Sequence, residues 1–272
     1  MRPFLPRVPL PGAFLRAPLA HRALHDAAAR KPENSLSAIR AAVAAGFGIE
    51  VDLQLSADGQ AMVFHDDTLE RLTGAPGRVD ARPAAELGAL PLFGGSGEGM
   101  PTLAQALAAV AGKVALLLEL KDQSGRMGPT NGRLEAATAR ALKGYAGPVA
   151  VMSFNPEMVA RLAELAPDLP RGLTTYAFPP ADFPQAADDR ALEAHRARLA
   201  AIADYDRAGA SFVSHHWRDL ANPRLFELRA QGVPILCWTI RSREEERAAR
   251  RVAQNITFEG YLPDGARGRP LP

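Results

Sequence analysis

The chain has 272 residues, 47% of them hydrophobic, which is enough for a sizeable core and excludes an intrinsically disordered protein. Lys and Arg number 32 against 30 Asp and Glu, so the net charge of +2 gives no indication of nucleic-acid binding. No run reaches the ~18 apolar residues of a membrane span, and prolines interrupt any export signal in the first twenty residues. The single cysteine, Cys237, favours a reducing compartment. We therefore expect a cytoplasmic protein, and the sequence leaves its oligomeric state open.

Apolar runs of strand length alternate with stretches of helical periodicity along almost the whole chain. Eight strands are predicted, at 18–21, 48–53, 114–120, 149–153, 171–175, 211–215, 234–239 and 256–261. Helices are predicted between them, at 35–45, 102–110, 134–142, 156–165, 192–203, 223–230 and 242–252. This alternation predicts an α/β protein, a (β/α)8 TIM barrel in a single domain over residues 1–272. An open doubly wound sheet is the second choice.

One segment, residues 54–100, does not fit the βα repeat. It contains a hairpin with Asp58 and Gly59 at the turn, a short helix near Glu86 and a glycine-rich loop. We expect a small insertion after the second strand, at the mouth of the barrel. A second long segment, residues 175–189, follows the fifth predicted barrel strand and could cover the site.

Charged and imidazole side chains end the early strands, where the carboxyl ends of barrel strands form active sites. They are His21, Arg22, Glu50, Asp52, His65, Glu119 and Lys121. Because side chains alternate along a strand, Glu50 and Asp52 point to one face, and Glu119 and Lys121 do likewise. Carboxylates in such apolar runs are costly to bury unless they are paired or bind a cation. Three carboxylates without a convergent cysteine predict a hard-oxygen site for Mg²⁺ or Ca²⁺. The alternative for each carboxylate is an ion pair with Arg or Lys.

The two histidines, His21 and His65, are predicted to overhang the same mouth, where either could move protons near neutral pH. A hydrogen-bonded structural histidine is the alternative for each. Arg22 and Lys121 offer cationic donors that suit phosphate oxygens, or they form salt bridges with the neighbouring carboxylates.

Three other aromatic side chains are given less weight. His25 lies in a polar context and is expected to be solvated. His216 points to the face opposite to its neighbour His215 and is expected at the surface or in the core. Trp238 near the end of the seventh strand is either core filler or a lid over the ligand.

Taken in order, the motifs of the chain resemble those of the glycerophosphodiester phosphodiesterase family. The matching elements are His21-Arg22, Pro32-Glu33-Asn34-Ser35, Glu50-x-Asp52, Asp58-Gly59, His65-Asp66, Arg71-Leu72-Thr73, Pro101-Thr102-Leu103, Glu119-x-Lys121 and Trp238-Thr239. The resemblance implies the (β/α)8 fold and hydrolysis of a glycerophosphodiester to sn-glycerol 3-phosphate and an alcohol.

The resemblance also implies roles for the individual residues. The divalent metal would be held by Glu50, Asp52 and Glu119. The acid/base pair would be His21 and His65, with His21 assigned as the base and His65 as the acid. Phosphate or substrate would be bound by Arg22, Lys121 and Trp238. The floor of the site would be shaped by Glu33 and Asn34.

The sequence departs from the family pattern at three places. Ala23 stands where glycine is usual after His-Arg, in a loop that carries about three extra residues before Pro32. Arg241 replaces a frequent asparagine, and the last strand reads ITFEGYLP instead of ITDxP. The alternatives to the family activity are a phospholipase D-type hydrolase of lysophospholipids or sphingolipids on the same barrel and a catalytically silent barrel that binds phosphate metabolites.

Overall fold

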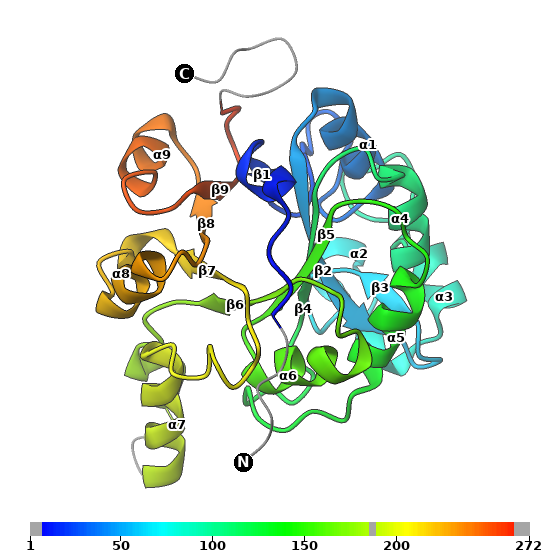
Figure 1. Cartoon of the computed structure of the whole chain (residues 1–272). Coiled ribbons are helices and arrows are strands. Elements are labelled where there is room, and N and C mark those ends of the chain that lie inside the picture. Colours follow the sequence, from blue (N-terminus) through cyan, green and yellow to red (C-terminus); the bar gives the residue numbers. More distant parts are fainter. Residues whose placement is uncertain (1–6, 185–188, 264–272) are drawn as a thin grey trace.

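The structure is a computed structural model that describes residues 7–184 and 189–263. Within these residues eight parallel strands close into a barrel in the order β1, β9, β8, β7, β6, β5, β4, β2, and β2 pairs again with β1 (Figure 1). The barrel strands are β1 (Leu19–Ala20), β2 (Gly48–Leu55), β4 (Leu116–Leu120), β5 (Val149–Ser153), β6 (Arg171–Thr175), β7 (Phe212–His216), β8 (Ile235–Ile240) and β9 (Asn255–Phe258). The (β/α)8 barrel is confirmed, and the ends of the predicted strands are shifted by at most about three residues.

Helices connect the strands and cover the outside of the barrel (Figure 1). They are α1 (Leu36–Ala45), α4 (Leu103–Val110), α5 (Arg133–Leu142), α6 (Pro156–Leu165), α7 (Arg190–Ala200), α8 (Pro223–Ala230) and α9 (Arg243–Ala249). Polar side chains cap the first turns of all of these helices except α5. Ser35 accepts from the backbone N–H of Ala38, and Thr102 forms a reciprocal capping box with Gln105. Gly46 ends α1 in the left-handed conformation at φ 79°.

The segment before β1 fills the barrel from the amino ends of the strands. A short 3-10 helix (Gly12–Leu15) carries Phe14, which is 0% exposed and belongs to the same buried cluster as Leu117 and Phe212 inside the barrel. The side-chain amide of Asn255 donates to the carbonyl oxygens of Phe14 and Ala17, at 2.7 Å each. The sequence assigned no structure to this proline-rich segment.

The predicted insertion is a hairpin followed by short helices. β3 (Ala61–Val63) pairs antiparallel with the end of β2 across the turn at Asp58 and Gly59, and α2 (Glu70–Thr73) and α3 (Ala84–Ala89) follow. The insertion has its own core, formed by Met62, Phe64, Leu69, Val79, Leu87, Leu92 and Met100. The hairpin and the helix near Glu86 are confirmed, whereas the single-domain organisation of residues 1–272 stays a prediction.

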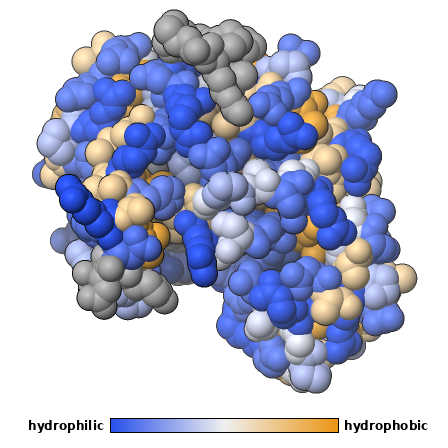
Figure 2. Space-filling view, turned by 90° about the horizontal axis from the view of Figure 1, so that it is seen from below, coloured by the Kyte–Doolittle hydropathy of each residue, from blue (hydrophilic) through white to orange (hydrophobic). Residues whose placement is uncertain are grey.

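No helix in the described ranges is long and apolar enough to cross a membrane. Figure 2 shows one face of the molecule, on which hydrophilic residues predominate and apolar residues form small groups. A cytoplasmic location stays a prediction of the sequence.

Candidate active site

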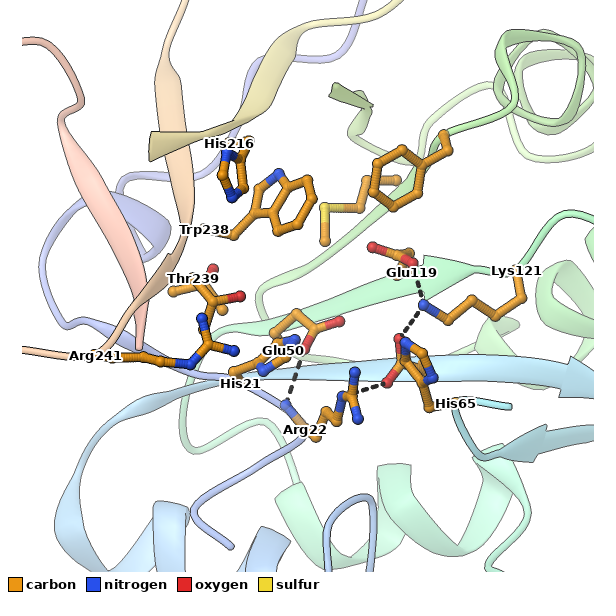
Figure 3. Close-up of a pocket in the computed structure, with 14 residues that line it drawn as sticks. His21, Arg22, Glu50, His65, Glu119, Lys121, His216, Trp238, Thr239 and Arg241 are labelled. Carbon is orange, nitrogen blue, oxygen red and sulfur yellow. Dashed lines mark hydrogen bonds and ion pairs between the residues drawn. The ribbon is translucent and has the colours of Figure 1, made fainter. Parts of the chain in front are cut away.

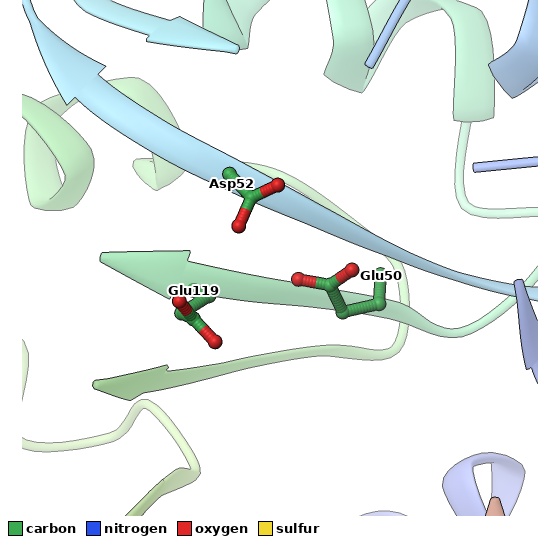
Figure 4. Close-up of side chains that lie close together, drawn as sticks. All are labelled: Glu50, Asp52 and Glu119. Atoms are coloured by element: carbon green, nitrogen blue, oxygen red, sulfur yellow. The ribbon is translucent and has the colours of Figure 1, made fainter. Parts of the chain in front are cut away.

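Three carboxylates from two neighbouring strands meet inside the barrel (Figure 4). Glu50 and Asp52 lie on β2, and Glu119 lies on β4 directly opposite Asp52 in the strand register. The alternate residues Val51 and Leu118 belong to the layer between the barrel and the helices, so the expected alternation holds. The three carboxylates are 1–6% exposed, and each offers an oxygen within 4.8 Å of the others. This spacing allows all three to bind one cation.

The electrostatics of Glu50 support a cation at this position. Burial, together with the charges of Asp52 and Glu119, raises the pKa of Glu50 well above its usual value. Its carboxylate accepts a hydrogen bond from the backbone N–H of Arg22 at 2.9 Å. A buried carboxylate facing two others is costly unless positive charge is added, so the three oxygens fit a divalent ion with hard ligand preference.

Lys121 lies beside the triad and neutralises part of its charge (Figure 3). Its ammonium group binds Asp52 at 2.7 Å and Glu119 at 2.5 Å. Although burial raises the pKa of Asp52, Lys121 and then His65 and Arg22 lower it more, and the net pKa lies below the usual range. The salt bridges between Lys121 and the carboxylates, which the sequence left open as the alternative to phosphate binding, are therefore present. They leave one N–H of the ammonium group for another acceptor.

Arg22 and the Glu33-Asn34 element form the neighbouring wall. Arg22 binds Glu33 at 2.8 Å, and its Nε lies 3.7 Å from Asp52. Asn34 donates to the Asp52 carboxylate at 2.9 Å and accepts from the Asp52 backbone N–H at 3.2 Å. Asn34 thus fixes the orientation of a triad carboxylate. Ala23, the residue that replaces glycine, adopts a left-handed φ of 65° and still donates to the Glu50 carbonyl at 2.9 Å.

Both histidines line the same pocket as the triad (Figure 3). The Nδ1 atom of His65 lies 2.7 Å from Asp66, whose other oxygen is bound by Arg71 at 2.5 Å. Burial and the charge of Lys121 lower the pKa of His65, which favours its neutral form. The Nδ1 atom of His21 lies 2.5 Å from Glu259.

The opposite side of the pocket is aromatic and apolar. Trp238 lies edge-on to Phe154, with ring centroids 5.4 Å apart, and its indole N–H donates to the Ser214 carbonyl at 3.1 Å. His216 contacts Trp238 at 5.0 Å and also lines the pocket. The expectation that His216 lies at the surface or in the core is therefore wrong. The opposite orientation of its neighbour is confirmed, because His215 is fully buried and binds Asp219 at 2.9 Å.

The loop after β6 does not reach the pocket within its described part. Residues 176–184 are absent from the lining, and Tyr176 contributes only by packing its ring 5.8 Å from that of Phe154, which does line the pocket. Residues 185–188 of the predicted cover lie outside the described residues.

The pocket has a volume of about 330 Å³, the lower end of the range for small-molecule sites.

Two functional candidates were missed from the sequence. Glu259 directly follows β9, so the rule that found Glu119 and Lys121 at a strand end also applies to it. Arg241 directly follows β8, lines the pocket and binds Glu259 at 2.5 Å. Two of the three departures from the family pattern, Arg241 and the altered last strand that carries Glu259, therefore meet in one ion pair. The expectation that His25 is freely solvated is wrong. Its Nε2 is buried and lies 3.7 Å from Glu259.

Comparison with known proteins identifies relatives of this barrel. Bacillus subtilis YhdW is 33% identical over 167 residues, covering 58% of this chain and 65% of that protein. A glycerophosphodiester phosphodiesterase of Caldanaerobacter subterraneus is 32% identical over 150 residues, covering 52% and 60%. The matches thus span less than two thirds of the length of these curated relatives.

A solved structure matches over nearly the whole barrel. It is a phosphodiesterase of Oleispira antarctica in complex with the product sn-glycerol-3-phosphate, with 25% identity, a TM-score of 0.71, and coverage of 90% of this chain and 94% of that one. The sequence model of the glycerophosphoryl diester phosphodiesterase family matches residues 21–256. The chain therefore belongs to the glycerophosphoryl diester phosphodiesterase family.

Proposed function

We propose that this protein hydrolyses glycerophosphodiesters to sn-glycerol 3-phosphate and an alcohol with the help of a divalent cation. The observation that carries the proposal is the convergence of three buried carboxylates and two histidines on one small pocket. Membership of the family and the product bound to the Oleispira antarctica relative support the same reaction.

The proposed metal ligands are Glu50, Asp52 and Glu119, and the preferred ion is Mg²⁺ or Ca²⁺ because every donor is a carboxylate oxygen. When bound, such an ion would act as a Lewis acid toward the phosphoryl oxygens.

The two imidazoles are the proposed proton-transfer groups. One takes the proton from the attacking water or glycerol 2-hydroxyl, and the other protonates the departing alkoxide oxygen. Because burial and Lys121 lower the pKa of His65, its neutral ring suits the base. His21 is the other imidazole at the pocket and takes the role of the acid. This assignment is the reverse of the one made from the sequence.

The cationic side chains are proposed to orient the phosphate. Two of the three N–H groups of the Lys121 ammonium donate to Asp52 and Glu119, and one remains. The guanidinium group of Arg22 also has N–H groups beyond the one that binds Glu33. Both residues line the pocket, so the remaining N–H groups can donate to phosphate oxygens.

The shape of the pocket favours a small diester over a lipid. Its volume of about 330 Å³ suits a glycerophosphodiester, and Trp238, Phe154 and Met152 form an apolar wall on one side only. A lysophospholipid would need an apolar groove for its acyl chain as well. We propose that Trp238 contacts the substrate at this wall.

A panel of diesters tests the proposal. The purified protein is expected to release sn-glycerol 3-phosphate from glycerophosphocholine, glycerophosphoethanolamine or glycerophosphoglycerol, and not from lysophosphatidylcholine, in an enzyme-coupled assay for the product. Glu119→Gln and His21→Ala are each expected to lower kcat by about 100-fold or more, because each removes a group that acts in the transition state.

The control for these variants is Glu227→Gln. Glu227 pairs with Arg224 on the exposed surface of α8, so the same chemical change there should leave turnover unchanged. Faster hydrolysis of lysophosphatidylcholine than of every diester would replace the proposal with the phospholipase D-type activity. Binding of diesters without any turnover would replace it with a silent barrel.

A further inference from the structure

Three neighbouring strands of the barrel end in side chains that contact one another. β1, β9 and β8 lie side by side, and His21, Glu259 and Arg241 are the first residues beyond them. The backbone ladder extends to these positions. The N–H of His21 donates to the Phe258 carbonyl at 2.9 Å, and the N–H of Glu259 donates to the Ile240 carbonyl at 3.0 Å. The backbone hydrogen bonds of the barrel therefore fix the positions from which the three side chains extend.

The carboxylate of Glu259 is held through both of its oxygens. Its Oε2 lies 2.5 Å from the Nδ1 of His21, and its Oε1 is bound by the guanidinium group of Arg241 at 2.5 Å. Only 18% of the Glu259 side chain is exposed. Burial alone raises the pKa of Glu259, but the hydrogen bond with His21 and the nearby His25 and Arg241 side chains outweigh it and hold the pKa far below the usual range.

An ionised carboxylate can only accept hydrogen bonds, so the Nδ1 of His21 must carry the proton. The remaining ring nitrogen, Nε2, is then the one that can exchange a proton with a ligand in the pocket that His21 lines (Figure 3). His65 has the same arrangement, with Asp66 at its Nδ1 and Arg71 on the other carboxylate oxygen.

We propose that Glu259, held in place by Arg241, is a positioning residue that fixes the ring orientation and the Nδ1–H tautomer of His21. Its effect on turnover rests on the proposed phosphodiesterase function. Its effect on the His21 ring does not, so the two can be tested separately.

The kinetic test compares Glu259→Ala, Glu259→Gln and Glu259→Asp with the wild-type protein in the diester assay. Loss of a carboxylate that orients an imidazole is expected to lower kcat by about 10- to 100-fold with little change in KM. Glu259→Asp should recover part of the loss, and added formate should raise the kcat of Glu259→Ala by restoring a carboxylate at Nδ1. The matched control is Glu227→Ala on α8, whose carboxylate also pairs with an arginine.

The spectroscopic test is a long-range ¹H–¹⁵N correlation spectrum of protein labelled with ¹⁵N-histidine, with the His21 signals assigned by their absence in His21→Asn. The wild-type protein is expected to show His21 as the Nδ1–H tautomer above the pH at which the ring loses its charge. Glu259→Ala is expected to shift it to a mixture of both tautomers, and Glu227→Ala should not.

An unchanged kcat together with an unchanged His21 tautomer in Glu259→Ala would overturn the proposal. If Glu259→Ala does not fold, Glu259→Leu, which fills most of the same space and offers no acceptor to Nδ1, decides the question by the same two measurements. If the wild-type protein hydrolyses no diester, the proposed function fails, whereas the tautomer measurement still supports or overturns the role of Glu259.

Discussion

At the scale of single residues, the site consists of buried charges that compensate one another incompletely. Lys121 pairs with Asp52 and Glu119, whereas Glu50 faces both carboxylates and has a raised pKa. The sequence predicted the three carboxylates because each lies in an apolar run. It could not decide whether Lys121 binds phosphate or pairs with acids, since that depends on side-chain geometry across two strands.

A first prediction concerns the replacement of Lys121 by methionine. Lys121→Met leaves the carboxylates without their cation, and removing one partner of a buried pair costs about 3–5 kcal/mol. Urea unfolding in the presence of a chelator should show a loss of this size, and added Mg²⁺ or Ca²⁺ should recover more stability in Lys121→Met than in the wild type. The exposed Lys113→Met is the control. Wild-type stability of Lys121→Met in chelator would show that Lys121 does not compensate the triad.

At the scale of elements, the carboxyl ends of the strands position the site, and the segment before β1 fills the barrel from the amino ends of the strands. The predicted strands and helices were accurate because buried parallel strands read as apolar runs and capping residues mark helix starts. Glu259 was missed because it follows the last strand, where the family pattern differs. The role of residues 7–18 was missed because a proline-rich segment without periodicity gives no signal of burial.

A second prediction tests the packing of this amino-terminal segment. Phe14 is fully buried in the barrel, and a Phe→Ala change in a core costs about 3–5 kcal/mol. Chemical denaturation of Phe14→Ala should therefore show a large loss of stability, whereas Phe226→Ala, at a side chain that is 50% exposed, should be nearly neutral. Equal stability of the two variants would mean that Phe14 does not fill the barrel.

At the scale of the whole molecule, buried histidines link stability to pH. His215 is fully buried between Thr175 and Asp219, and burial lowers its pKa despite the hydrogen bond to Asp219. The unfolded chain, in which histidine titrates near ~6.5, therefore binds this proton more readily than the folded protein. The stability contributed by neutral His215 is present above that pH and is lost as the pH falls below it.

A third prediction follows from this linkage. When the pH is lowered from 7.5 to 5.5, the wild type should lose more of its free energy of unfolding than His215→Gln does. The comparison of the two proteins cancels the contributions of other titrating groups. Urea unfolding followed by circular dichroism at both pH values measures it. Parallel pH dependence in the two proteins would contradict a lowered His215 pKa.

The most direct test of the central claim is the stoichiometry of metal binding joined to activity. Calorimetric titration of chelator-treated protein with Mg²⁺ or Ca²⁺ is expected to show one site per chain that disappears in Glu119→Gln, and the same ion should restore diester hydrolysis with the same midpoint. Full hydrolysis of glycerophosphocholine by metal-free protein, or unchanged metal binding in Glu119→Gln, would contradict the claim that Glu50, Asp52 and Glu119 hold the ion on which the reaction depends.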